Sequence, residues 1–354
     1  MSTLPGMAFH LPEDQRDLLI RACVCPRDKA TAAWQEWCSL VETAPARHVD
    51  SSLVPEHYYT RLLSPFYRRM IEWNVESSQN NLVKRIHQKT WTRNLHLLNQ
   101  LGQFVGLLDA EDISSYIMKG AALIVEVTQD RGYRYCSDMD LVVEEKNLER
   151  TLSIARETGW RATAEFDADT RKWKHAIRLE RSLDVRLDLH WRPTYLWQRT
   201  SFSNELLAGC QPLHSSTLRC KVMSPSDLFF LLCAHGATLP GREQYWLIDA
   251  TRVLESSRGL DADRIAYLAR TSHTRHLLRN VLRTLRAFGL EGLPTEVEHF
   301  DPNRSNAVPG LFSDNLTVFE RLSQANMMLG TDGPTGGMLA RICEYIRLCS
   351  TNRQ

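Results

Sequence analysis

The sequence lacks the features that identify several large classes of protein. No segment approaches the roughly 20 consecutive apolar residues that a membrane span requires. The GxSxG, Walker A and dinucleotide-binding glycine patterns are missing, and so is any Cys/His set with zinc-ligand spacing. Charge of one sign is also missing, because 43 Lys and Arg stand against 42 Asp and Glu. The overall charge therefore does not predict nucleic acid or an anionic membrane as a partner.

The nine cysteines are few, scattered and odd in number, and they form no CxxC pair. Such thiols behave as small apolar side chains and are typical of a reducing cytosol. The first residues, MSTLPGMAFHLPEDQRD, do not join a basic segment to an apolar one as a secretory signal does. We therefore expect a cytoplasmic protein.

The first third of the chain is helical in pattern. Apolar residues recur three to four apart through residues 1–112, and a long helix is predicted from about Gln79 to Leu108. The expected apolar stripe of that helix comprises Trp91, Leu95, Leu98, Val105 and Leu108. The basic residues near its start are expected to form a solvated face: Lys84, Arg85, Lys89 and Arg93.

The pattern changes at Ser115. SYIMKG predicts a short strand ended by a glycine, AALIVEVTQD a helix, and DLVVE, at 140–144, a second strand. A helix over 147–160 follows and stops near Gly159. The runs KWKHAIRLE and LDVRLDLHW then predict a hairpin that turns at Arg181-Ser182. Residues 113–200 are thus an α/β core.

Residues 201–354 return to a helical pattern. Ser224 is a plausible N-cap, followed by Pro225 at the first helical position and Asp227 at the third. Helical runs at 244–257 and 261–290 precede a stretch rich in Pro, Gly and Asn around 293–310, and two final helices are expected after it. The predicted fold is α+β, with a small mixed sheet flanked by an N-terminal helical region (1–112) and a C-terminal helical domain (201–354).

The strongest chemical signal is Asp138-Met139-Asp140 at the start of the predicted strand 140–144. Side chains at i and i+2 of a strand point the same way, so two carboxylates are presented together beside a buried apolar run. Paired carboxylates need a counter-charge, and a hard divalent cation with oxygen ligands supplies one. A solvated turn without metal explains an isolated D-x-D equally well.

Two further features favour the metal site. Lys119-Gly120 places a glycine at a strand-to-helix turn, where backbone N–H groups can approach a phosphate. Downstream, polar and apolar residues alternate, so one strand face would offer a third carboxylate: Asp184, Arg186, Asp188 and His190 against Val185, Leu187, Leu189 and Trp191. The alternative is an edge strand with a wet face.

These segments resemble a known family. KGAAL, RYCSDMDLVV and VRLDLHW are similar to the nucleotidyltransferase superfamily with the DNA polymerase beta-like fold, and most similar to bacterial nucleotidyltransferases encoded near peptide or polysaccharide biosynthesis genes. The resemblance covers about residues 115–192 and continues more weakly into LLCAH and WLIDATRVL. The sequence departs from the family's glycine pair at Ala121, which leaves only backbone groups for a phosphate.

The resemblance implies that Asp138 and Asp140 bind two Mg²⁺ ions that hold the triphosphate of an NTP. It implies that Asp188 shares the metal near the acceptor and activates the acceptor hydroxyl. The remaining contacts implied for the nucleotide are phosphate binding by Ser137 and the Gly120 amide, and neutralisation of the leaving pyrophosphate by Lys119 or Arg134.

Several other residues have two interpretations. His190 either orients Asp188 or the acceptor, or is structural. His235 and Asp249 either face the cleft or form a buried hydrogen-bonded pair that ties two helices together. A basic stripe at helical spacing either receives an anionic partner or is a solvated face: Arg275, Arg279, Arg283 and Arg286.

The expected reaction is transfer of a nucleoside monophosphate from an NTP to a small molecule, sugar or peptide, with release of pyrophosphate. One alternative makes RNA, such as a tRNA end, the acceptor; the near-zero net charge disfavours it and the arginine stripe favours it. Another is a catalytically silent nucleotide-binding regulator. Retention of Asp138, Asp140 and Asp188 favours catalysis over that last alternative.

Overall fold

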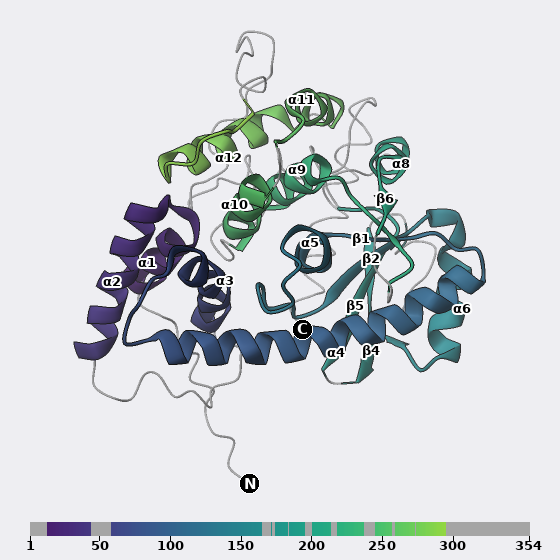
Figure 1. Cartoon of the computed structure of the whole chain (residues 1–354). Coiled ribbons are helices and arrows are strands. Elements are labelled where there is room, and N and C mark those ends of the chain that lie inside the picture. Colours follow the sequence, from purple (N-terminus) through teal and green to yellow (C-terminus); the bar gives the residue numbers. More distant parts are fainter. Residues whose placement is uncertain are drawn as a thin grey trace, which may run out of the picture.

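The computed structural model describes residues 13–43, 58–164, 171, 174–182, 184–194, 200–213, 218–236, 245–256, 259–272 and 274–294. A mixed seven-stranded sheet lies beside a larger body of helices (Figure 1). The α+β fold expected from the sequence is confirmed. The Pro/Gly/Asn-rich stretch from residue 295 onward and the two final helices lie outside the described residues.

The expected helices precede the sheet. They are α1 (Glu13–Val24), α2 (Arg27–Thr43), α3 (Tyr58–Trp73) and the long α4 (Asn80–Ala110). In α4 the predicted stripe is partly wrong, because Trp91 is 39% exposed whereas Thr90 and Asn94 are buried. Asn94 is buried for its hydrogen bonds: its amide donates to the carbonyls of Arg131 and Arg134, both at 2.6 Å. Polar partners here override the apolar pattern.

The sheet has the strand order β3-β4-β5-β2-β1-β7-β6. The strands are β1 (Ser115–Ile117), β2 (Met139–Val143), β3 (Arg161–Ala162), β4 (Ala176–Ser182), β5 (Val185–His190), β6 (Gln211–Pro212) and β7 (Lys221–Val222). The β4–β5 hairpin is confirmed as antiparallel, with an irregularity between Glu180 and Ser182. Its predicted turn at Arg181-Ser182 is wrong, because both residues belong to β4 and the chain turns between Ser182 and Val185. The pairs β2–β5 and β1–β7 are parallel.

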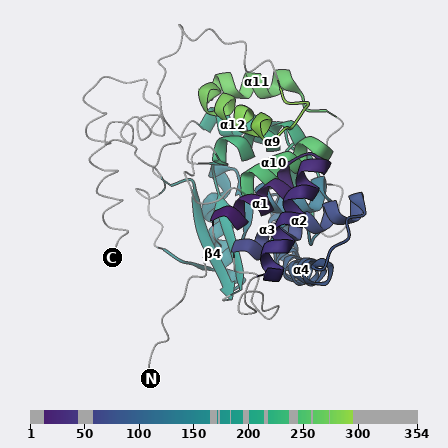
Figure 2. The same cartoon turned by 90° about the vertical axis from the view of Figure 1, so that its left-hand side faces the viewer.

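Each face of the central strands has its own character. Met139, Leu141 and Val143 on β2 are buried, as are Val185, Leu187 and Leu189 on β5. Helix α4 contacts β1, β2 and β5, and α6 (Leu148–Glu157) packs on α4. In Figure 2 the labelled helices lie to one side of β4. The polar residues of β4 and β5 are therefore on the face that these helices leave open.

The helix predicted over 121–130 begins two residues earlier in the structure, and its second half is π-helical. It starts at Lys119 as α5 (Lys119–Ala122) and continues as a π-helical turn, η1 (Leu123–Val127). The predicted helix over 147–160 is α6, entered through a 3₁₀ turn, η2 (Glu145–Asn147). Gly159 after α6 has φ 85°, which confirms the role of glycine in ending that helix.

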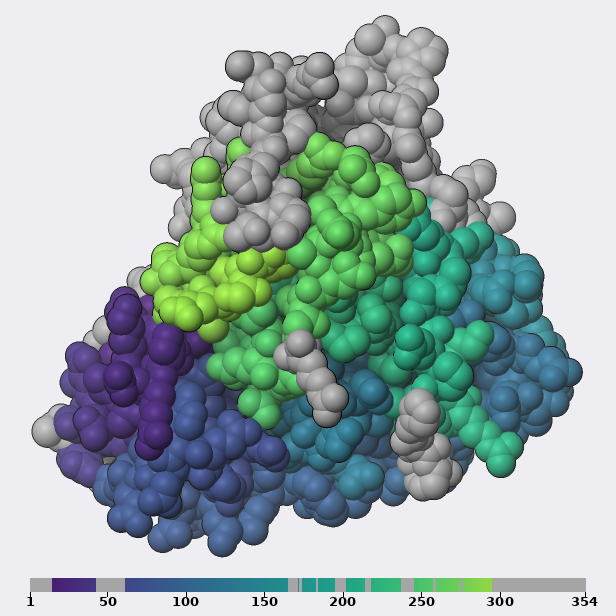
Figure 3. All heavy atoms as spheres, turned by 45° about the horizontal axis from the view of Figure 1, so that its top comes forward, coloured from purple at the N-terminus to yellow at the C-terminus, as the bar shows by residue number. Residues whose placement is uncertain are grey.

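The second helical group is α8 (Thr200–Ala208), α9 (Pro225–Gly236), α10 (Tyr245–Ser256), α11 (Ala262–Thr271) and α12 (Arg275–Ala287). The N-cap at Ser224 is confirmed, since its Oγ accepts a hydrogen bond from the Asp227 amide at 3.1 Å. The run over 261–290 divides into α11 and α12. Figure 3 shows α12 at the surface beside the N-terminal helices.

Both helical groups share one hydrophobic core with the sheet. The buried cluster runs from Leu18 on α1 to Leu293 beyond α12. A buried ionic network adds to it: Arg69 on α3 is 4% exposed, donates to the Cys25 carbonyl at 2.6 Å and pairs with Glu255 on α10. Within the described residues no helix has both the length and the apolarity needed to cross a bilayer.

The core of α4 yields a test of packing. Phe104 is 1% exposed and its ring lies 5.7 Å from that of Trp160. We expect Phe104→Ala to lower the free energy of unfolding by about 3–5 kcal/mol, because the cavity cannot close fully. Urea denaturation followed by far-UV circular dichroism measures it. Leu107→Ala, at a position 41% exposed on the same helix, is the control and should change stability by less than about 0.5 kcal/mol; equal losses would contradict the packing.

Candidate active site

Three carboxylates lie together on the open face of the sheet. Asp138 immediately precedes β2 and Asp140 lies on it, so both point away from the buried Met139 and Leu141. The parallel register of β2 and β5 places Asp140 directly beside Asp188. Their side chains are 25%, 13% and 24% exposed, in chain order. The structure thus brings together the three acids that were singled out in the sequence.

Arg178 was missed by the sequence analysis. It lies opposite Asp188 in the β4–β5 hairpin, and its guanidinium binds both oxygens of Asp188, Nε to Oδ1 at 2.8 Å and Nη2 to Oδ2 at 3.0 Å. The same Nη2 lies 3.0 Å from Oδ2 of Asp138. The hairpin was the available signal, but its irregular register hides which residue faces Asp188.

Asp140 has basic partners of its own. Nζ of Lys119 lies 2.7 Å from its Oδ1, and Nε2 of His190 lies 3.0 Å from the same oxygen. Burial alone would raise the pKa of the Asp140 carboxyl, but Lys119 and His190 outweigh it and hold this pKa well below its usual range. Asp140 is therefore ionised at neutral pH.

Asp138 has the opposite electrostatic environment. Burial raises the pKa of its carboxyl, and the negative charges of Asp140 and Asp188 raise it further. Arg178 and a hydrogen bond from Ser137 Oγ at 3.1 Å offset only part of this effect. The negative charge at this corner of the sheet is thus incompletely neutralised by the side chains around it.

The donor set fits a hard divalent cation. Carboxylate oxygens on an open face are the ligands that Mg²⁺ prefers, since it keeps part of its water shell. In the part of the chain that the structure describes, no group of three or more His, Cys, Asp or Glu side chains is arranged so that it could hold a metal ion. The carboxylates instead form ion pairs with the cationic side chains of Arg178 and Lys119.

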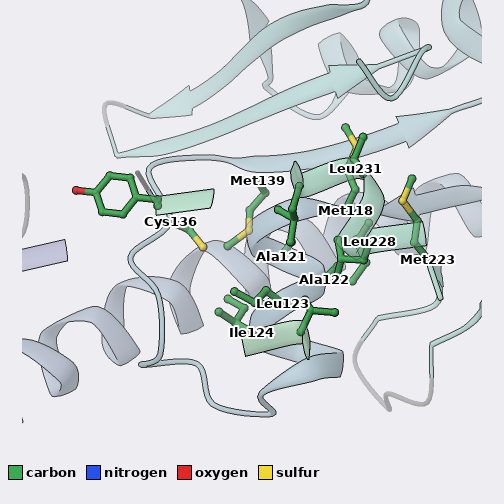
Figure 4. Packing of buried hydrophobic residues seen from close by; sticks show 14 of the residues in the cluster. Met118, Ala121, Ala122, Leu123, Ile124, Cys136, Met139, Met223, Leu228 and Leu231 are labelled. Carbon is green, nitrogen blue, oxygen red and sulfur yellow. The ribbon is translucent and has the colours of Figure 1, made fainter. Parts of the chain in front are cut away.

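The turn between β1 and α5 lies next to these acids. A Cβ on Gly120 would come within 2.4 Å of an Arg134 guanidinium nitrogen and 3.1 Å of the Cys136 sulfur, so any larger residue here would displace the end of the Arg134 side chain. Lys119 has φ 49°, a strained backbone for a residue with a side chain. Figure 4 shows Ala122 beside Leu228 and Met118 beside Leu231, and α5 contacts α9.

Arg134 and Asp249 form an ion pair inside the protein. Nε of Arg134 lies 2.7 Å from Oδ2 of Asp249, whose side chain is 3% exposed. Burial raises the Asp249 pKa to about 6 against the opposing charge of Arg134. Asp249 on α10 therefore pairs with the loop before β2. Arg134 lies behind Gly120 instead of reaching freely into the open face.

Histidines gather around Asp140. His190 is 2% exposed and binds Asp140, whereas its expected neighbour was Asp188. The ring of His175, which the sequence analysis missed, is 5.3 Å from that of His190. Burial, followed by the positive charge of Lys119, lowers the pKa of His235 on α9 to about 4. These histidines therefore lie close to Asp140, where they can either support the carboxylates or contact a substrate.

Arg93 does not belong to a solvated face, contrary to the expectation for the basic start of α4. Its Nε donates to the Cys136 carbonyl at 3.2 Å, and its guanidinium lies 4.9 Å from the ring centre of Tyr135. Arg93 thus holds the loop that leads to Asp138. The arginine stripe lies elsewhere, on α12, whose opposite side packs Leu278, Val281, Leu282 and Leu285 into the core.

Comparison with known proteins gives one family and several distant structures. The model of the family described as "Uncharacterised nucleotidyltransferase" matches residues 59–289. No curated protein matches. The solution structure of the antibiotic-resistance factor ANT(2'')-Ia has a TM-score of 0.38 and 15% identity, over 54% of this chain and 98% of that one.

Two crystal structures are similar to the same degree. One is ANT(2")-Ia in complex with adenylyl-2"-tobramycin, with a TM-score of 0.37 and 14% identity over 51% of this chain and 98% of that chain. The other is an antigenic nucleotidyltransferase-like protein from Paracoccidioides brasiliensis, with a TM-score of 0.35 and 17% identity over 53% and 93% of the two chains. All three TM-scores lie below 0.5, so these structures are only distantly similar to this chain.

His235 yields a pH-dependence test in metal-free protein. Its folded pKa of about 4 lies below the ordinary 6.5, so the unfolded chain binds the proton more readily. Stability is therefore intact above pH 6.5 and is lost as the pH falls through 4, by about 3 kcal/mol. Chemical denaturation of His235→Gln across this range should show a shallower loss than wild type. His96→Gln, at an exposed position on α4, is the control, and identical slopes for all three proteins would refute the assignment.

Proposed function

The chain belongs to the family of uncharacterised nucleotidyltransferases, and from this premise we propose a magnesium-dependent enzyme that transfers a nucleoside monophosphate from an NTP to a small-molecule, sugar or peptide acceptor. The observation that carries the proposal is the side-by-side register of Asp140 and Asp188, with Asp138 on the same open face. Three oxygen-donor residues converge there with incompletely neutralised charge.

In this proposal Asp138 and Asp140 would hold magnesium together with the triphosphate of the NTP, and Asp188 would be a further ligand on the side of the acceptor. Bound magnesium supplies charge neutralisation at the attacking and leaving oxygens. His190 orients Asp140 through its Nε2, and Lys119 keeps Asp140 ionised. As the acceptor oxygen bonds to phosphorus, its hydroxyl must lose a proton. Asp188 either takes that proton or orients the hydroxyl.

The reaction balances without any further reactant. The acceptor oxygen forms a bond to the α-phosphorus as the bond from that phosphorus to the bridging oxygen breaks, and pyrophosphate leaves with the electron pair. Ser137 and the Gly120 amide are proposed to bind phosphate oxygens. Lys119 is the better candidate to neutralise the leaving group, because its ammonium contacts Asp140 within the carboxylate site. Arg134 pairs with Asp249 behind the Gly120 turn and acts by positioning that turn.

The acceptor class rests on two properties of the chain. Its formal net charge is +1, which gives little attraction for a polyanion such as RNA. The carboxylate face is open, so an acceptor of modest size can approach Asp188. A bacterial biosynthetic role and a cytoplasmic location remain part of the proposal, on the sequence resemblance and the free cysteines.

Nucleotide binding is the first test. Isothermal titration of the four NTPs with Mg²⁺, as nonhydrolysable analogues, should show metal-dependent binding of at least one. Asp138→Ala/Asp140→Ala should abolish it, because two of the proposed metal ligands are lost. Absence of binding for every NTP would refute the proposed enzyme class.

Turnover is the second test, with pyrophosphate release measured against a panel of acceptors. Asp188→Asn should lower the rate by about a hundredfold to a thousandfold, since it removes a group that acts in the transition state. Asp184→Asn, at the exposed end of the same strand face, is the matched control and should retain the wild-type rate. Binding without pyrophosphate release on any acceptor would favour a silent regulator, and release only with RNA would favour the RNA alternative.

A further inference from the structure

The guanidinium of Arg178 occupies the space between two of the proposed metal ligands. It forms a two-pronged ion pair with Asp188 and a third contact, at 3.0 Å, with Asp138. These acids come from different strands, and Arg178 comes from a third. A cation coordinated by both Asp138 and Asp188 would need the position that this guanidinium holds.

The contact is suited to exchange. The Arg178 side chain is 43% exposed, so water can solvate the guanidinium when it leaves. Ion pairs with an exposed cation contribute little net stability, and the two-pronged geometry places this pair above the typical value. A divalent ion carries twice the charge of a guanidinium and prefers carboxylate oxygens. Displacement of Arg178 by the metal therefore costs little free energy, and the stronger attraction between the metal and the carboxylates favours it.

Arg186, on the same face of the sheet, pairs with an acid outside the carboxylate site. It is equally exposed, at 43%, but it pairs with Glu180, which is not one of the site's acids, at 3.1 Å. Within the part of the chain that the structure describes, the ion pairs of Arg178 are with Asp138 and Asp188 alone. Release from these acids thus frees its charge for another anion.

We propose that Arg178 is a displaceable counter-cation: it closes the carboxylate site in the free enzyme, and metal binding releases it to bind a phosphate group of the nucleotide. This inference rests on the proposed function, because it takes Asp138 and Asp188 as metal ligands. Arginine suits the second role, since its planar fork binds phosphate oxygens in pairs. Metal and nucleotide binding are then coupled through one side chain.

The test uses Mn²⁺ as the probe for metal and a nonhydrolysable NTP analogue as the probe for nucleotide. Free Mn²⁺ is measured by electron paramagnetic resonance during titration of the full chain. Without nucleotide, Arg178→Gln should bind Mn²⁺ about fivefold more tightly than wild type, because the competing cation is gone. At saturating Mn²⁺ it should bind the analogue about tenfold more weakly, because a charge-assisted contact to phosphate is lost.

Arg186→Gln is the matched control, since it removes the same charge from the same face two residues from Asp188 without touching Asp138 or Asp188. It should change neither affinity by more than about twofold. Arg178→Lys keeps the charge but loses the fork, so it should retain weak Mn²⁺ binding and lose nucleotide affinity. Circular dichroism confirms that each variant is folded.

The outcomes separate the inference from the function. Mn²⁺ affinity in Arg178→Gln that equals or falls below wild type, while both proteins bind nucleotide with Mn²⁺, overturns the displacement and leaves the proposed enzyme intact. Tighter Mn²⁺ binding with unchanged nucleotide affinity overturns the phosphate role. Failure of all variants to bind Mn²⁺, with or without the analogue, overturns the proposed function itself and this inference with it.

Discussion

The parallel pairing of β2 with β5 is the constraint on which the site depends. It sets Asp140 beside Asp188, and the two-residue period of the strand adds Asp138. Three carboxylates on one corner of a sheet repel one another, so the surrounding structure must supply positive charge. Lys119 from the β1–α5 turn and Arg178 from β4 do so, at 2.7 Å and 2.8 Å. The strained backbone of Lys119 is tolerated because its ammonium is needed there.

Both helical groups take part in forming this corner. The loop that leads into β2 is bound by Asn94 and Arg93 from α4 on one side and, through Arg134, by Asp249 from α10 on the other. The expected three-part division at residues 112 and 200 follows changes of secondary structure, but the hydrophobic core runs through both positions. The helices therefore do more than flank the sheet: they fix the loop that aims Asp138.

Local periodicity predicted much of this structure, and long-range pairing explains what it missed. The alternation around Asp188 and the run after Asp140 predicted two strands with their acids on one face, and the structure has both. The stripe on α4 was wrong at Trp91 because hydrogen bonds to a distant loop bury Asn94 in its place. Arg178 and the Arg134–Asp249 pair depend on hairpin register and on contacts between distant segments, which no local pattern contains.

The charge balance of the corner connects its structure with the proposed chemistry. Three carboxylates meet two cationic side chains in direct contact, Lys119 and Arg178. Burial, followed by the charges of Asp140 and Asp188, raises the pKa of Asp138. If Arg178 is displaced, Lys119 alone faces the three carboxylates, and the remaining negative charge of two matches the charge of a divalent ion. A second divalent ion becomes favourable only with the negative charge of a triphosphate beside it. In the proposed mechanism the charge of the site would be balanced only with metal and nucleotide bound together, and Arg178 would serve as the counter-cation before they bind.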